Sequence, residues 1–197
     1  MISFFRHENS QGDTQLPWLA IIITAIPVFV YLVLGPAPEW LIFDRKAVLQ
    51  GEVWRLVTGH WVHSDAEHAL WDIAALGILS VILDKQSRVL LIISLTLGTF
   101  GVDIWIWYIN ESLAYYCGLS GILNTVFISV IFSLWEKTEN SILWIIFTGA
   151  VAKVLLEIIT SQAVFTQTAW PSVPEVHAVG LLIGIVTMLS YKKLIKD

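Results

Sequence analysis

The stretch Cys117-Gly118-Leu119-Ser120-Gly121 follows a polar loop and begins an apolar run that continues to Trp135. Turn-forming glycines before helix-compatible residues predict that Ser120 lies in the first turn of a buried helix. The first N–H groups of a helix have no partner within it, and the helix dipole favours negative charge there. An oxyanion formed beside Ser120 would therefore find donors aimed at it. Taken alone, the pentapeptide fits a helix-packing patch better, because small residues let another helix approach.

The composition of the chain is that of a membrane protein. Of its 197 residues, 56% are hydrophobic and only 14% are charged, whereas soluble domains carry about 25% charged residues. The length fits one domain. A net charge of −5 is a poor match for nucleic acid, and a single cysteine excludes an internal disulfide. We expect no cofactor and no metal.

Hydropathy predicts an all-α protein with six membrane-spanning helices, because each apolar run approaches the length of about 20 residues that crosses a bilayer. The expected spans are 16–34, 66–83, 89–109, 118–135, 141–160 and 176–191. Residues 39–61 are too polar to span and too apolar for a free loop, so we expect this segment to lie in the interface. A polar tail, 1–15, and a basic tail, 192–197, flank the single domain 16–191.

The basic residues predict the orientation of this domain. Six spans put both termini on one side of the membrane, and that side carries Arg6, Lys85, Arg88, Lys137, Lys192, Lys193 and Lys196. The other side carries Arg45, Lys46 and Arg55. The excess of basic residues at the termini places both of them in the cytoplasm.

With this topology, polar residues from distant spans reach one layer near the outer face. Ser120 and His177 begin the fourth and sixth spans, and His63, His68 and Asp72 lie at a similar depth around the start of the second. Polar groups in hydrocarbon cost several kcal/mol unless they are paired or functional. The layer is therefore a candidate active site.

A glycine stripe predicts how two of these residues meet. His177, Gly180 and Gly184 are spaced i, i+3 and i+7, so they share one helix face that can approach another helix closely. The glycines beside Ser120 form the natural partner surface. Ser120 and His177 then come within hydrogen-bond distance, as a serine nucleophile and an imidazole base require.

Short motifs follow one another between Glu52 and Gly184: Trp54-Arg55-x-x-Thr58, His63, His68, Asp72, Gly118-Leu119-Ser120-Gly121 and His177-x-x-Gly180-x-x-x-Gly184. Together they resemble the rhomboid intramembrane serine proteases. The resemblance implies a six-span core with a Ser120–His177 dyad and no aspartate. It also implies an oxyanion site from the Ser120 N–H and the His63 side chain, support of the second helix by His68, and a fifth span that acts as a lateral gate.

Two residues depart from the family pattern. Rhomboids usually carry Asn where this chain has Asp72, and an aromatic residue where it has Asn124. Such a compact, divergent form resembles the rhombosortase branch. That resemblance implies a bacterial inner-membrane enzyme with its active site facing the periplasm. Its substrates are exported proteins whose Gly-rich C-terminal sorting tail includes one apolar helix.

The two departures leave three arrangements open. Asp72 is protonated and donates to the oxyanion itself, or it is ionised and accepts from His68. In the third arrangement, Asn124 has become the amide donor and Asp72 orients it. The third explains both departures at once, because an amide lost from the second helix reappears on the fourth.

Lys153 and Glu157 are a further charged pair, spaced i, i+4 on the fifth span. At about 1.5 Å per residue, both lie in the outer half of the bilayer. We expect this face to line a wet substrate groove and to contact a substrate tail. The alternative is that the charges extend towards the interface.

Two other functions remain open. A metal-dependent membrane hydrolase could use His60, His63, His68 and Asp72 as ligands, although no His-Glu-x-x-His helix is present. A non-catalytic rhomboid-like binding protein would be marked by loss of Ser120 or His177, and both are retained.

Overall fold

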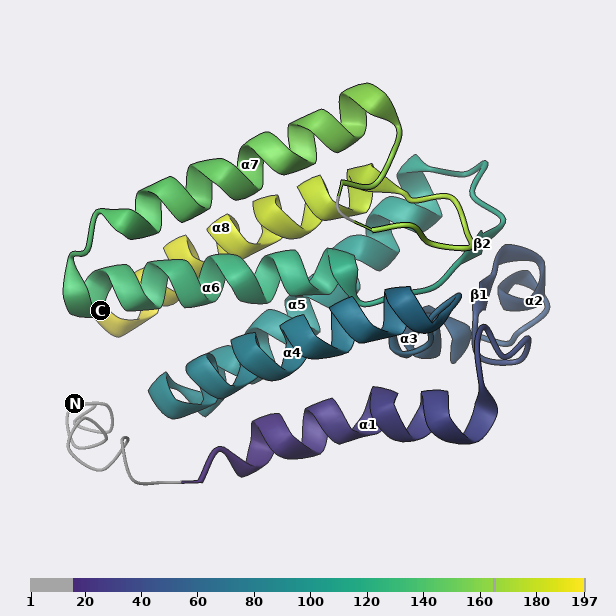
Figure 1. Cartoon of the computed structure of the whole chain (residues 1–197), viewed down its shortest axis with the longest axis horizontal. Helices are drawn as coiled ribbons and strands as arrows, with labels where there is room; N and C mark the ends of the chain where they lie inside the picture. Colours follow the sequence, from purple (N-terminus) through teal and green to yellow (C-terminus); the bar gives the residue numbers. More distant parts are fainter. Residues whose placement is uncertain (1–15, 165, 197) are drawn as a thin grey trace.

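The computed structural model describes residues 16–164 and 166–196, and most of these are helical. The long helices form a bundle (Figure 1). They are α1 Trp18–Leu34, α4 Ala66–Gln86, α5 Arg88–Ile104, α6 Ser120–Thr138, α7 Ile142–Thr160 and α8 Pro174–Lys196. The shorter elements are β1 Phe43–Asp44, α2 Arg45–Leu49, α3 Arg55–Thr58, η2 Gly59–Trp61, η3 Trp105–Ile109 and β2 Tyr115–Tyr116. The expected tail 1–15 lies outside the described residues, as does Asp197.

Within the described part of the chain, four helices are long and apolar enough to cross a membrane by length and composition. They are α4, α5 continued by η3, α7 and α8. Helix α1 is apolar but has only 17 residues, and α6 does not meet the same criteria. The chain is therefore an integral membrane protein.

Helix α6 is the centre of the bundle, which explains its polar composition. It packs against α8, α5, α4 and α7, and Figure 1 shows it running between α7 and α4. Its polar side chains bond to neighbouring helices: Thr125 Oγ1 donates to Gly180 O at 2.9 Å, and Ser94 Oγ donates to Ser129 Oγ at 2.8 Å. A helix surrounded by protein can carry such groups because each of them is satisfied.

The segment between α1 and α4 is fastened across one end of the bundle. Strand β1 pairs antiparallel with β2, with Phe43 opposite Tyr116. The Arg45 guanidinium donates to Leu113 O and Asn110 O, each at 2.9 Å, and lies 5.0 Å from the centre of the Trp107 ring. These contacts hold the loop before α6 in place, and that loop carries the residues next to Ser120.

Several helix ends differ from the sequence prediction, since α4 continues to Gln86 and α6 continues to Thr138. Helix α6 begins at Ser120 itself, because Gly118 adopts a left-handed conformation with φ of 119°. Helix α8 continues to Lys196, so the expected basic tail from residue 192 is helical up to that point. Lys192 pairs with Glu136 of α6 at 2.7 Å, which favours the extension of α8.

Candidate active site

Gly118 places Ser120 at the start of α6. A side chain at Gly118 would put its Cβ 2.5 Å from His68 Nε2 of α4, and the positive φ also favours glycine. The Gly118 N–H donates to Gly59 O at 3.1 Å, which ties this turn to η2. The loop can therefore run directly over α4, and Ser120 opens α6 with its N–H in the first helical turn.

His177 of α8 lies beside Ser120. Helix α8 packs along α6 through Gly180 and Gly184, which are on the same face as His177. His177 Nε2 and Ser120 Oγ are 2.9 Å apart. The contact expected from the glycine stripe is present, and it joins residues 57 positions apart in the sequence.

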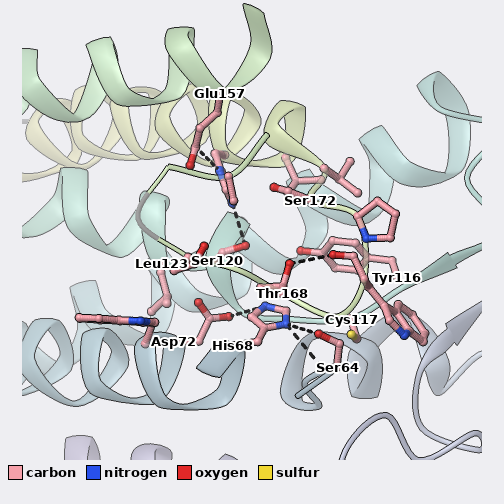
Figure 2. A pocket seen from close by; sticks show the side chains of 18 of the residues that line it. Ser64, His68, Asp72, Tyr116, Cys117, Ser120, Leu123, Glu157, Thr168 and Ser172 are labelled. Atoms are coloured by element: carbon pink, nitrogen blue, oxygen red, sulfur yellow. Dashed lines mark hydrogen bonds and ion pairs between the residues drawn. The ribbon is translucent and has the colours of Figure 1, made fainter. Parts of the chain in front are cut away.

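The other imidazole nitrogen of His177 contacts Glu157 of α7. His177 Nδ1 and Glu157 Oε2 are 2.9 Å apart, and Figure 2 shows the dashed lines running from Glu157 through the ring to Ser120. Glu157 Oε1 accepts from Lys153 Nζ at 2.6 Å and from the Val164 N–H at 2.9 Å. The Lys153–Glu157 pair was expected from its spacing, but the contact with His177 was not.

Asp72 of α4 supports the turn before Ser120. Its Oδ2 accepts the Leu119 N–H at 2.8 Å, and it lies 3.4 Å from both His63 Nε2 and His68 Nε2. The two imidazoles stack edge to face, with centroids 5.1 Å apart. Of the three arrangements open from the sequence, this geometry corresponds to a carboxylate that accepts hydrogen bonds.

The amide of Asn124 is satisfied by its own helix. Asn124 Nδ2 donates to Ser120 O, one turn earlier, at 2.8 Å. This differs from the expectation that Asp72 orients the amide, because the Asp72 contacts are with Leu119, His63 and His68. An amide nitrogen carries two hydrogens, and Asn124 lines the same cavity as Ser120.

A cavity of about 710 Å³ opens over these groups. Its walls come from α4, α6, α7, α8, the β2 region and residues 163–164 and 166–173. The polar part of the lining includes Ser120, His177, Asp72, Asn124, Lys153 and Glu157. His68 also lines the cavity, whereas His63 is only 1% exposed and lies outside the lining. The implied oxyanion donor His63 is thus placed behind Asp72.

Cys117 is another potential nucleophile on the cavity wall. Burial raises the pKa of the Cys117 thiol to about 12, and the neighbouring Asp72 carboxylate adds to the shift. The thiolate is the reactive form of cysteine, so Cys117 is unreactive near neutral pH. Ser120, which has a base within hydrogen-bond distance, is the stronger candidate.

The histidines expected to hold a metal in the hydrolase alternative are divided between different partners. His60 Nε2 lies 2.9 Å from Asp103 Oδ1 of α5, while His63 and His68 both face Asp72. Across residues 16–164 and 166–196, no three His, Cys, Asp or Glu side chains are grouped as a metal site. This arrangement of donors does not fit the metal-dependent alternative.

A family model described as "Rhomboid domain" matches residues 50–193, which is more than half of the chain. The matched range includes α4 to α7, all of α8 except its last three residues, and every residue of the site described above. No match to the sequence was found among curated proteins.

Proposed function

The chain belongs to the rhomboid family of intramembrane serine proteases, and on this premise we propose that it is an endopeptidase that uses Ser120 and His177. The observation that carries the proposal is the 2.9 Å distance between Ser120 Oγ and His177 Nε2 at the wall of the cavity. A serine hydroxyl becomes nucleophilic when a neighbouring base takes its proton. One alternative nucleophile, Cys117, is held as a thiol.

The reaction follows from this pair. Ser120 Oγ attacks the carbonyl carbon of the scissile peptide while its proton passes to His177 Nε2. The C–N bond then breaks, and His177 returns the proton to the leaving amine. Water next attacks the acyl-serine ester and gives a proton to His177. The ester bond breaks, and the proton returns to Ser120 Oγ as the carboxyl product leaves.

The oxyanion of each tetrahedral intermediate needs donors near Ser120. We assign the Ser120 N–H and the second hydrogen of the Asn124 amide to this role, since both groups lie at the start of α6 and Asn124 lines the cavity. Asp72, Gly118, His63 and His68 support the turn from behind. Donors fixed before the reaction stabilise developing charge without reorganisation.

The substrate proposed from the branch resemblance is a membrane-anchored protein that is cleaved near the outer end of its transmembrane segment. The C-terminal sorting tail of this substrate is Gly-rich and includes one apolar helix. Helix α7 is the least buried of the four membrane-spanning candidates, which favours entry of such a helix from the lipid beside it. The Lys153 side chain, 37% exposed, lines the cavity and is suited to contact substrate carbonyls.

The proposed orientation rests on the distribution of basic residues. In it, α1 and α6 also span the bilayer, residues 39–61 lie in the interface, and both termini are cytoplasmic. The active site then lies at the outer face, which the rhombosortase resemblance implies is the periplasmic face of a bacterial inner membrane. Trp40, Leu49, Val53, Trp54 and Val57 expose apolar side chains in the segment between α1 and α4, which supports its interfacial placement.

A serine-reactive fluorophosphonate tests the catalytic proposal. The purified protein in detergent is expected to be labelled, and Ser120→Ala is expected not to be. Equal labelling of both, or of neither, would overturn the proposal. A single-span substrate with a Gly-rich tail, compared with one whose tail glycines are replaced by alanine, tests the substrate class separately.

A further inference from the structure

We propose that Glu157 is a positioning residue that completes a Ser120–His177–Glu157 triad, where the family resemblance implies a dyad. The inference rests on the proposed function, because it assigns a third group to the same reaction. It also changes the expected role of Glu157 from a substrate contact to a group that holds the catalytic base. Lys153 keeps its place on the cavity wall.

The contacts of Glu157 leave it little capacity to bind substrate. One carboxylate oxygen faces His177 Nδ1 at 2.9 Å. The other accepts from Lys153 Nζ and from the Val164 N–H. The residue is 1% exposed, in contrast to the 37% exposure of the Lys153 side chain. The carboxylate is therefore committed to protein groups, and His177 is the only one of them that also touches Ser120.

This contact sets the tautomer of His177. An ionised carboxylate only accepts hydrogen bonds, so the ring nitrogen facing it, Nδ1, carries a hydrogen. In the neutral ring, Nε2 then has a free lone pair, and that lone pair faces the Ser120 hydroxyl. Glu157 thus keeps the base ready, and it stabilises the imidazolium that forms when His177 takes the serine proton, without itself accepting a proton.

The surroundings of Glu157 predict what an amide would do in its place. In Glu157→Gln, the position of Oε1 still faces two donors, Lys153 Nζ and the Val164 N–H. The amide oxygen is drawn to that side, which turns the amide NH₂ towards His177 Nδ1. Nδ1 must then accept a hydrogen bond, so the ring hydrogen moves to Nε2 and blocks the lone pair that Ser120 requires.

The triad joins three helices, since Ser120, Glu157 and His177 belong to α6, α7 and α8. Of these three helices, α7 is the one exposed along most of its length. The third group is in place when the end of α7 lies against α8.

Asp84 offers a matched control for the test. Like Glu157, it is a buried carboxylate that pairs at a spacing of four residues, here with Arg88 at 2.8 Å. It also accepts a backbone N–H from a distant residue, Ala20, at 3.1 Å. It lies near the C-terminal end of α4, whereas the site lies at the N-terminal end. Asp84→Asn therefore removes a comparable buried charge without touching a histidine.

The experiment compares the rate of fluorophosphonate labelling for the wild type, Glu157→Gln, Glu157→Asp and Asp84→Asn, with thermal unfolding measured for each. We expect Glu157→Gln to slow labelling by about 10²- to 10⁴-fold, as expected for a wrong tautomer. The labelling rate of Asp84→Asn should stay within about threefold of the wild type, because Asp84 contacts Ala20 and Arg88 and shares no partner with the triad. Glu157→Asp retains the charge and should recover part of the rate lost in Glu157→Gln.

Cleavage kinetics provide a second readout. A positioning residue lowers kcat with little change in KM, whereas a substrate contact raises KM and leaves probe labelling intact. A folded Glu157→Gln protein that is labelled at the wild-type rate would overturn the triad. So would equal losses in Glu157→Gln and Asp84→Asn, or a KM effect alone.

Two further comparisons keep the test decisive. If Glu157→Gln is unstable, adding Lys153→Met removes the ammonium left without a counter-charge. The Val164 N–H remains to hold the amide oxygen on its side, and the comparison is then made against Lys153→Met alone. Failure of the proposed function is distinct, because in that case the wild type itself is not labelled. A labelled wild type with an equally reactive Glu157→Gln would reject only the triad.

Discussion

Gly180 of α8 lies directly against the backbone of Gly121 of α6. A Cβ added at Gly180 would come within 1.9 Å of Gly121 O. A Cβ at Gly184 would come within 2.6 Å of Ile128 Cβ, one more turn along the same face. The two helix backbones are thus in contact near the site, and this contact sets the distance between Ser120 and His177.

The first prediction follows from that contact. Gly180→Ala is expected to force α8 away from α6, because the added Cβ would meet the backbone of Gly121, which cannot move aside as a flexible side chain can. Labelling by a fluorophosphonate should fall by at least tenfold, and the melting temperature in detergent should fall as well. Both are measured on purified protein.

Gly149→Ala is the matched control. Gly149 is also within a long helix, α7, but a Cβ there meets nothing within 4 Å. Alanine is the better helix former, so this variant is expected to be at least as stable as the wild type. Tolerance of Gly180→Ala to the same degree would contradict the close-contact argument.

The second prediction concerns Ser120 and His177 as a unit. Ser120→Ala and His177→Ala should each abolish cleavage of a single-span substrate, and the double variant should be no worse than either single variant. When two residues act together in one chemical step, removing either one already abolishes that step, so removing the second costs no further activity. If His177→Ala retained most of the activity, another base would have to serve Ser120, and the 2.9 Å contact would be structural.

The third prediction concerns the oxyanion. Asn124→Ala should lower the rate of cleavage by about 10²-fold, the usual effect of losing one oxyanion donor. Asp72→Asn should recover part of this loss in the Asn124→Ala background, because it returns an amide to the same cavity. Rates are measured with a single substrate at saturation.

A normal rate for Asn124→Ala would show that its amide serves only the Ser120 carbonyl, which it contacts at 2.8 Å. The thermal stability of the variant separates the two roles. Loss of the hydrogen bond to Ser120 O alone should cost about 1 kcal/mol of unfolding free energy and should leave the rate unchanged.

The fourth prediction concerns pH and the segment that covers the cavity. Burial alone would raise the pKa of Asp65, but hydrogen bonds from Ser64, the His68 N–H and the Ala169 N–H outweigh it and hold this pKa below its ordinary value. Asp65 therefore stabilises the folded state most when it is ionised. That contribution is present above the pKa of the unfolded state and is lost as the pH falls through the lower folded value.

The measurement compares wild type and Asp65→Asn in detergent. The wild type should be the more stable protein at pH 7, and the difference should shrink towards pH 3. The Ala169 N–H lies 2.7 Å from Asp65 Oδ2, so protease cleavage in the 161–173 segment should increase over the same pH range. A difference that grows on acidification would contradict the assigned direction.

The sequence by itself determined the class of protein and predicted a common depth for its polar residues. Apolar runs of about 20 residues predict spanning helices, and the structure confirms a mostly helical membrane protein with four clear candidates. The spacing of His177, Gly180 and Gly184 was enough to predict the contact with the start of α6. These inferences use only hydropathy and the spacing of residues within single helices.

Only the tertiary structure decided how each helix is rotated about its own axis and which neighbouring helix each of its faces contacts. An i, i+4 spacing shows that Lys153 and Glu157 share a face, but it contains no information on the helix that this face meets. Only the packing of α7 beside α8 brings Glu157 to His177. Depth could have raised this possibility, since both residues lie near the same end of the bundle.

The hydrogen-bond partners of Asp72 could not be predicted from the sequence for a related reason. Its shortest contact is with the Leu119 N–H, and the direction of a backbone N–H depends on the path of the loop before α6. That path is set by Gly118 lying against His68 and by the pairing of β1 with β2. Hydropathy and helical spacing fix positions along an element, whereas a hydrogen-bond partner also requires the rotation and the loop geometry that only the packed fold provides.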